Sequence, residues 1–301
     1  MCPRACNVDR NVNTGFCGMT NDIYAARAAL HMWEEPCISG EHGSGAVFFS
    51  GCTLRCIFCQ NSEIAAAQVG KKITVERLSD IFLELQDKCA NNINLVTATH
   101  FVPQVAEALV KAKNKGLVIP VVYNSSAYEN VSTLNMLDGL VDVYLPDMKY
   151  IDSRLSAEYS KASDYADVAK AAIHEMVRQT GKPEFFIVDD ELVKSGRVEA
   201  GIMKKGVIVR HLVLPGTTKD SKAVIKYLID TYGDDIYISI MSQYTPFERL
   251  KKHPLLSRKV TRKEYNSVVD YAIDCGINNG FIQEGDVAEE SFIPEFDYEG
   301  I

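Results

Sequence analysis

The sequence has 301 residues, of which 47% are hydrophobic and 24% charged, and its formal net charge is −8. These proportions are typical of a folded globular protein and exclude a disordered or collagen-like chain. Because the charge is acidic and no long Lys/Arg block is present, we expect no nucleic-acid partner. The longest apolar stretches, near residues 46–49 and 117–122, are far shorter than the ~20 residues of a membrane helix, so we expect no membrane partner either.

The first residues, MCPRAC, lack the apolar segment of a secretory signal peptide. We therefore expect a reducing, cytoplasmic location, where the nine cysteines serve as metal ligands or as catalytic or inert thiols rather than in disulfides. Seven of the nine lie in the first fifth of the chain: Cys2, Cys6, Cys17, Cys37, Cys52, Cys56 and Cys59. This clustering requires an explanation.

From Gly45 onward, short β-branched runs alternate with helical patterns, which predicts six βα units and a parallel sheet. The predicted strands cover residues 46–49, 93–97, 118–123, 141–145, 207–213 and 236–241. Three of the helices that follow have clear end signals: Thr74 as an N-cap, Pro103 in the first turn of the second helix, and a capping box of Thr261 and Glu264 in the last.

Six βα units with no G-x-G-x-x-G after any strand favour an incomplete barrel over a doubly wound dinucleotide-binding sheet. We therefore predict an α/β fold in which residues 46–301 form an incomplete (β/α)6 barrel and residues 1–45 form a loop-rich N-terminal cap. Residues 182–205 are an insertion that could form a small hairpin. Because barrel active sites lie at the C-terminal ends of the strands, we expect the functional residues in the loops after the six strands.

The loop after the first predicted strand contains Cys52, Cys56 and Cys59 in a C-x-x-x-C-x-x-C pattern. Three closely spaced thiolates on one loop can hold three irons of a four-iron cluster and leave the fourth iron without a protein ligand. A tetrahedral zinc site is the main alternative, but zinc ribbons pair two C-x-x-C knuckles and need a fourth ligand. The spacing therefore favours an iron–sulfur cluster.

This motif resembles that of the radical S-adenosylmethionine (radical SAM) enzymes, in which a C-x-x-x-C-x-aromatic-C loop follows the first barrel strand. Phe58 fills the aromatic position. Further stretches resemble the branch of pyruvate formate-lyase activating enzyme-like proteins, namely residues 31–36 (HMWEEP), 43–52 (GSGAVFFSGC), 59–61 (CQN) and 210–216 (RHLVLPG). The resemblance extends over nearly the whole chain and implies a barrel of the radical SAM type.

The resemblance also implies the cofactors, a [4Fe-4S] cluster and S-adenosylmethionine. In this family the open iron binds the amino and carboxylate groups of S-adenosylmethionine, and reduction of the cluster yields a 5′-deoxyadenosyl radical that abstracts a hydrogen atom. An electron donor such as flavodoxin or ferredoxin is implied as a partner. Iron–sulfur potentials are tuned by net charge, hydrogen bonding and exposure, so the protein would set the low potential that this chemistry needs.

Polar residues follow the second and third predicted strands. Thr97 and Thr99 lie where better-known relatives carry a Gly-Gly-Glu that receives the S-adenosylmethionine amino group, so a Thr hydroxyl or a backbone carbonyl would have to take this role. His100 could donate a proton or simply cap the next helix. Asn124 and Ser126 suit a ribose hydroxyl or a carboxylate, although both residue types are also favoured in ordinary turns.

Charged residues follow the fourth strand and lie within the fifth. Asp147 and Lys149 resemble the Asp-x-Lys of the activating enzymes, where Lys149 would meet the S-adenosylmethionine carboxylate and Asp147 would orient it or a bound cation. A self-satisfied pair at the barrel rim is the alternative. Of the consecutive residues Arg210 and His211, alternation allows only one to face the interior, and the resemblance favours Arg210.

After the sixth strand, Gln243 and Tyr244 lie where relatives contact the adenosyl ribose, and the alternative for the aromatic residue is a place in the core. In the N-terminal region, Cys2, Cys6 and Cys17 could bind zinc or a second cluster, but without a clear fourth ligand the sequence favours free thiols. No ferredoxin-type cysteine run is present in the sequence.

The sequence therefore predicts an enzyme that makes a radical on a protein or peptide, as an activating enzyme does when it installs a glycyl radical. Residues 1–45 and the C-terminal residues 292–298 could line the lateral opening of the barrel and admit an extended peptide. Radical chemistry on a small molecule is the alternative within enzymes. A zinc-binding interaction module is the alternative from another class, and the six βα units disfavour it.

Overall fold

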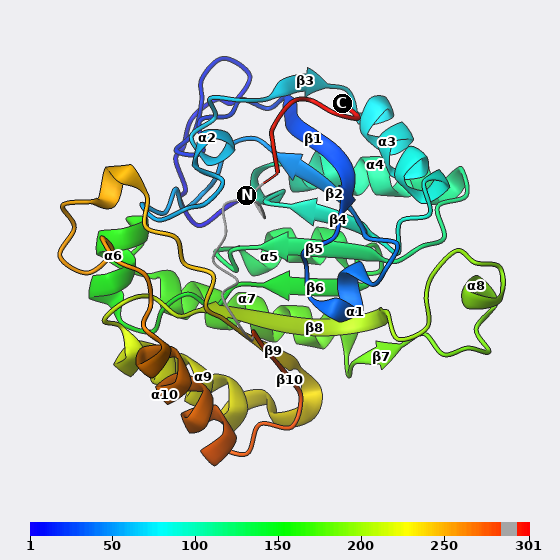
Figure 1. The fold of residues 1–301 in the computed structure, drawn as a ribbon. Helices are drawn as coiled ribbons and strands as arrows, with labels where there is room; N and C mark the ends of the chain where they lie inside the picture. The colour runs from blue at the N-terminus through cyan, green and yellow to red at the C-terminus, as the bar shows by residue number, and fades with distance from the viewer. Residues whose placement is uncertain (284–293) are drawn as a thin grey trace.

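A computed structural model describes residues 1–283 and 294–301. Its helices and strands alternate along most of the chain (Figure 1). The strands are β1 (Ile23–His31), β2 (Ser44–Phe49), β3 (Lys71–Ile73), β4 (Ile93–Val96), β5 (Val121–Ser125), β6 (Val143–Pro146), β7 (Glu184–Phe185), β8 (Met203–Leu212), β9 (Tyr237–Met241) and β10 (Gly280–Ile282). The α-helices are α1 (Pro36–Ser39), α2 (Ser62–Ala65), α3 (Val75–Asp87), α4 (Val102–Asn114), α5 (Val131–Leu134), α6 (Ser153–Ser160), α7 (Tyr165–Thr180), α8 (Glu191–Lys194), α9 (Thr218–Tyr232) and α10 (Arg262–Asp274).

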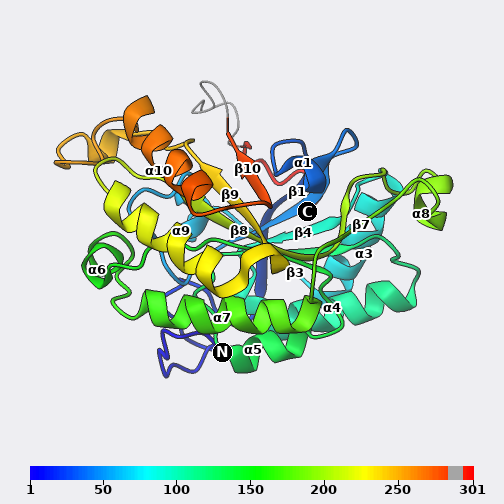
Figure 2. The same ribbon diagram turned by 90° about the horizontal axis from the view of Figure 1, so that it is seen from below.

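The strands form one sheet in the order β10-β9-β8-β6-β5-β4-β2-β1-β3, with β7 attached to β8. All pairs from β2 to β10 along this order are parallel. The sheet is open, with β3 and β10 at its edges. Helices α4, α7 and α9 cover one face of this curved sheet (Figure 2). This arrangement confirms the predicted α/β fold with an incomplete parallel barrel.

The six predicted strands correspond to β2, β4, β5, β6, β8 and β9, whose residues are almost all buried. The predicted helix ends are confirmed as well. The Thr74 side chain accepts a hydrogen bond from the Arg77 N–H at the start of α3. Thr261 and Glu264 form a reciprocal capping box on α10, and Pro103 lies in the first turn of α4.

The N-terminal region differs from the prediction in one respect. Residues 1–22 form turns and irregular backbone, as expected, but Ile23–His31 is the nine-residue strand β1, which pairs antiparallel with β2 and β3. The sequence analysis assigned no strand to this segment because its four alanines, which are poor strand formers, hide a segment that the sheet buries. The insertion at residues 182–205 does contain an antiparallel pair, between β7 and the beginning of β8.

The C-terminal residues lie along β1. The Ala28 N–H donates to the Glu299 carbonyl at 2.8 Å, and Arg27 forms an ion pair with Asp297 at 2.6 Å. Residues 292 and 293 of the predicted C-terminal lining segment lie outside the described residues. Among the helices that the structure describes, none has the length and hydropathy needed to cross a membrane.

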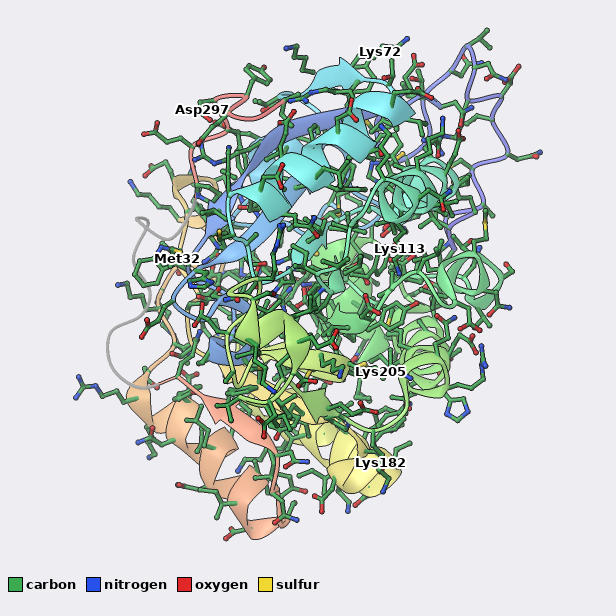
Figure 3. The ribbon with its side chains drawn as sticks, turned by 90° about the vertical axis from the view of Figure 1, so that its right-hand side faces the viewer. Met32, Lys72, Lys113, Lys182, Lys205 and Asp297 are labelled. Carbon is green, nitrogen blue, oxygen red and sulfur yellow. The ribbon has the colours of Figure 1, made fainter. Side chains whose placement is uncertain are left out.

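The parallel strands set the position of the site because their carboxyl ends all lie on one side of the sheet, which is called its carboxyl edge below (Figure 1). The loops after β2, β4, β5, β6, β8 and β9 therefore converge there. The amino ends of these strands lie on the opposite side, which faces the viewer in Figure 3 and carries the labelled residues Lys113, Lys182 and Lys205.

Candidate functional site

A cavity of about 1240 Å³, including the part open to solvent, lies at the carboxyl edge of the sheet. It collects eleven of the thirteen residues that the sequence analysis assigned to the cluster or to S-adenosylmethionine: Cys52, Cys56, Phe58, Cys59, Thr97, Asn124, Ser126, Asp147, Lys149, Arg210 and Gln243. These residues come from the loops and ends of six different strands. Convergence of this kind is what a ligand site at the top of a parallel barrel requires.

The other two predicted residues lie behind the cavity wall. Thr99 is buried, and its hydroxyl donates to Oε1 of Glu129 at 2.6 Å. Tyr244 is buried as well, and its hydroxyl donates to the Leu256 carbonyl while its ring contacts Phe58 edge-on. In this arrangement both side chains are satisfied by the protein itself, so the structure does not bring either of them to the site.

The loop of three cysteines leaves β2 through Gly51, whose φ of +83° is a conformation that favours glycine. A Cβ at Gly51 would lie 2.7 Å from the Cys17 carbonyl oxygen and 2.5 Å from Met19. The loop then turns so that the Leu54 N–H points at Sγ of Cys52 (3.4 Å). The Ser160 hydroxyl donates to Sγ of Cys56 at 3.0 Å. Hydrogen bonds of this type stabilise thiolates and tune an iron–sulfur potential.

Two contacts hold the loop against the rest of the barrel. Arg249 donates to the Ile57 carbonyl at 3.0 Å and to the Cys59 carbonyl at 2.7 Å. Phe58 is buried and packs edge-on against Tyr150 and other aromatic rings. Phe58 therefore anchors the loop and is also one of the residues that line the cavity.

The cysteine side chains fit a cluster by their chemistry. In the described part of the chain, no group of three or more His, Cys, Asp or Glu side chains is arranged to hold a single metal ion. A four-iron cluster places each cysteine on a different iron, so it needs three thiols around a common cavity. Cys52, Cys56 and Cys59 line one cavity together.

Burial affects the protonation of these thiols. It raises the pKa of Cys56, although the nearby Lys149 ammonium opposes the shift. Burial and the adjacent Cys52 and Cys56 thiols raise the pKa of Cys59 to about 12. Because thiolates are the species that bind iron, assembly of a cluster must release protons from these thiols.

A chain of four alternating charges crosses the cavity wall. Arg210 donates to Glu34 at 3.0 Å and to Asp147 at 2.9 Å, and Lys149 Nζ lies 2.7 Å from the second Asp147 oxygen. Arg210 also donates to the Asn124 side-chain oxygen at 2.6 Å. The ring of His211 instead lies on the other face of β8, against the Met148 carbonyl, so the prediction that Arg210 faces the interior is confirmed.

The charges in this chain stabilise one another. Burial raises the pKa of Asp147, but Arg210 and Lys149 more than offset this, and the pKa lies below its ordinary value. Burial lowers the pKa of Lys149, but Asp147 reverses the effect, so the pKa lies above its ordinary value. Both groups therefore stay ionised at neutral pH, and Lys149 is presented as a cation beside the cysteines.

The ends of β4 and β5 supply the polar part of the wall. The Thr97 N–H donates to the Asn124 carbonyl at 2.9 Å. Thr97 has a φ of +63°, which is unusual for a β-branched residue and turns the chain sharply at the cavity. His100, by contrast, is buried away from this cavity with Nε2 2.7 Å from the Ser50 carbonyl oxygen, and burial lowers its pKa to about 4. It is therefore no proton donor to the cavity.

Sequence reasoning did not assign a role to Glu34. Its carboxylate also accepts from the amides of Asn94 (3.1 Å) and Asn124 (3.2 Å), so it ties three strands together. Glu34 lies just after β1, a strand that the sequence did not reveal, and only its place within residues 31–36 pointed to it. His31 and Trp33 from the same segment line the cavity mouth.

The model of the Radical SAM superfamily matches residues 46–228, which is more than half of the chain. The chain belongs to the radical SAM superfamily. Its cofactors are accordingly a [4Fe-4S] cluster and S-adenosylmethionine, and it is an enzyme. A relative in Methanocaldococcus jannaschii, the uncharacterised protein MJ0674, is 28% identical over 278 residues, which cover 90% of this chain and 73% of that protein.

Comparison with solved structures gives the following similarities. SuiB of Streptococcus suis, in complex with the precursor peptide SuiA, aligns with a TM-score of 0.50 and 14% identity over 78% of this chain. The chain spans 46% of the length of SuiB. A domain of the pyruvate-formate lyase-activating enzyme of Bacteroides vulgatus aligns over 61% of this chain and 91% of that domain, with 10% identity and a TM-score of 0.39.

Proposed function

We propose that this radical SAM enzyme abstracts a hydrogen atom from a polypeptide segment that enters the cavity from the side, as an activating enzyme-like or peptide-modifying enzyme would. The observation that carries the proposal is the composition of the cavity mouth. His31 and Trp33 from the N-terminal region and Pro294 from the C-terminal region line it together with the barrel loops. A site walled by two extended segments suits an extended ligand better than a small metabolite.

The charges and apolar groups at the mouth support this reading. Trp33 is 62% exposed, so the cavity lining presents apolar surface of the kind that contacts peptide side chains. The ionised groups, by contrast, lie deeper and are paired with one another. SuiB, which shares the fold, is a protein whose structure was solved with a precursor peptide bound.

When bound, the cofactors would supply the reductive radical chemistry that removes the hydrogen atom. The residues of this chain would bind and orient them. Cys52, Cys56 and Cys59 would hold the cluster, and Lys149, oriented by Asp147, would bind the methionine carboxylate by a charge-assisted hydrogen bond. Thr97, Asn124 and Ser126 offer backbone and side-chain groups for the remaining polar atoms, and Phe58 closes the wall against water.

The reaction needs one electron per turnover, so we propose a low-potential donor such as flavodoxin or ferredoxin as a partner. We likewise propose a cytoplasmic location, where such donors and free thiols are present.

The test is production of 5′-deoxyadenosine by the reconstituted enzyme, with and without the protein encoded beside it or peptides from that protein. Deuterated peptide should stimulate the reaction and transfer deuterium into 5′-deoxyadenosine. The Cys52→Ala variant is the control and should produce none. Stimulation by a small metabolite alone, with deuterium passing from it, would establish small-molecule chemistry and overturn the proposal.

A further inference from the structure

A second cavity, of about 630 Å³ including its open part, lies in the N-terminal region and is distinct from the site above. Cys2, Cys6 and Cys17 all line it, and so does His100 from the loop after β4. None of these four residues lines the cavity at the carboxyl edge of the sheet. Three further cysteines therefore gather around a cavity of their own.

The three thiols are close neighbours. Sγ of Cys6 and Sγ of Cys17 each lie 3.6 Å from the position that a Cβ on Gly15 would take. Cys2 lines the same cavity as the other two. The Phe16 N–H donates to Sγ of Cys6 at 3.2 Å, the same kind of backbone contact that Leu54 makes with Cys52 in the first cysteine loop.

His100 offers the fourth ligand that the sequence analysis did not find for these three cysteines. Its ring is 1% exposed, and Nε2 lies 2.7 Å from the Ser50 carbonyl oxygen. A carbonyl can only accept, so Nε2 must carry the proton, and the neutral ring then has its lone pair on Nδ1. Nδ1 is buried and has no hydrogen-bond partner in the described structure. A histidine that ligates a metal typically donates its other ring N–H to a backbone carbonyl in this way.

We propose that Cys2, Cys6 and Cys17, with Nδ1 of His100, bind a second iron–sulfur cluster. All three thiols belong to residues that line one cavity. This is the arrangement that the first cysteine loop also shows, and it suits a cluster with each ligand on a different iron. Cys37 is excluded from the set because it is buried with Ile38 and Val122 in another part of the core.

Arg10 lines the second cavity, and Arg4 connects the N-terminal residues to the first cysteine loop. Arg4 donates to the Thr53 carbonyl at 2.7 Å and to the Ser160 carbonyl at 2.7 Å, and Arg10 donates to the His100 carbonyl at 2.8 Å. Such cations offset the negative charge of a cluster bound by thiolates, which is one of the factors that set its potential. Bound there, the cluster would also fix the irregular residues 1–22 against the loop that carries Cys52.

The experiment uses the full chain, purified and reconstituted without oxygen, with iron and sulfide measured per chain. The triple variant Cys52→Ala/Cys56→Ala/Cys59→Ala should keep about four irons and an EPR signal that S-adenosylmethionine does not perturb. Adding Cys2→Ala, Cys6→Ala and Cys17→Ala should remove both. The matched control adds Cys89→Ala and Cys275→Ala instead, and should leave both unchanged.

Loss of all iron from the first triple variant would overturn the proposal, as would one zinc per chain at this site in place of iron. If the sixfold variant does not fold, as judged by circular dichroism, Cys6→Ser in the otherwise native protein replaces it, because Cys6 is exposed. Pulsed EPR should detect an imidazole nitrogen coupled to the second cluster, and His100→Ala should abolish that coupling. These results do not depend on whether the enzyme acts on a peptide, so the proposed function is tested separately.

Discussion

Arg210 and Asp147 are joined twice, once through their side chains and once through their strands. Nε of Arg210 donates to Oδ1 of Asp147 at 2.9 Å, and the N–H of Met148 donates to the Arg210 carbonyl at 2.8 Å. The backbone bond fixes the register between β6 and β8 at their carboxyl ends, and this register sets the position of the side-chain bond. The orientation of Lys149, which lies on the other oxygen of Asp147, therefore depends on the pairing of two strands.

Replacing Arg210 with methionine should destabilise the protein strongly. The change leaves the largely buried Glu34 carboxylate without a cation and Asp147 with Lys149 alone, and breaking a buried pair in this way costs about 3–5 kcal/mol. Urea denaturation of the anaerobic protein measures the loss. The control is Arg154→Met. The Arg154 side chain is 89% exposed, so its ion pair with Asp152 should contribute at most about 1 kcal/mol. Equal losses in the two variants would contradict the assigned role of Arg210.

Replacing Cys52, Cys56 or Cys59 with alanine should remove the cluster that responds to S-adenosylmethionine, because the loop offers no other thiol in its place. About four irons per chain should be lost, together with the change that S-adenosylmethionine causes in the EPR spectrum of the reduced protein. The control is Cys275→Ala, whose thiol lies at the end of α10 outside the cavity. A variant that keeps its iron and cleaves S-adenosylmethionine would show that the cluster lies elsewhere.

Replacing Lys149 with alanine should weaken S-adenosylmethionine binding about 10- to 100-fold, because a charge-assisted hydrogen bond contributes about 1.5–3 kcal/mol. The affinity is measured by titration of the EPR spectrum of the reduced cluster. Lys113→Ala is the matched control, since Lys113 lies near the end of α4, on the side of the molecule opposite the cavity (Figure 3). Unchanged affinity in Lys149→Ala would remove Lys149 from the binding site.

The sequence predicted the six central strands because parallel strands buried on both faces are continuous apolar runs with clear boundaries. It predicted most of the site for the same reason, since residues at the ends of such strands must converge. It could not place β1, whose alanines give no strand signal, and consequently it missed Glu34, whose position depends on that strand.

Thr99 and Tyr244 are the reverse case, since the sequence predicted them as site residues and the structure does not bring them to the site. Both follow strands, as site residues do, but hydrogen bonds to Glu129 and to the Leu256 carbonyl hold them in the wall behind the cavity. Which way a side chain turns after a strand depends on partners that are distant in the sequence. The orientation of His100 likewise depends on a distant partner, the carbonyl of Ser50 in the turn before Cys52.

Glu129 should make the stability of the protein fall as pH rises from about 4.5 to 7. Burial raises the pKa of this carboxyl group to about 7, although the hydroxyls of Thr99 and Tyr123 donate to it. In the unfolded chain the carboxyl group loses its proton near its ordinary value of about 4.5. Between these two pH values the folded protein holds one more proton than the unfolded chain, so its free energy of unfolding decreases with pH.

Replacing Glu129 with glutamine should remove this pH dependence and leave the site intact, because the amide oxygen still accepts from both hydroxyls. The native protein should lose up to about 3 kcal/mol of stability across this range relative to the variant, as follows from the two pKa values. Urea denaturation at pH 5, 6 and 7 provides the measurement. The control is Glu175→Gln, since Arg178 lowers the pKa of Glu175 and its titration falls below this range. Parallel stability profiles for the native protein and Glu129→Gln would mean that Glu129 is already ionised in the folded state.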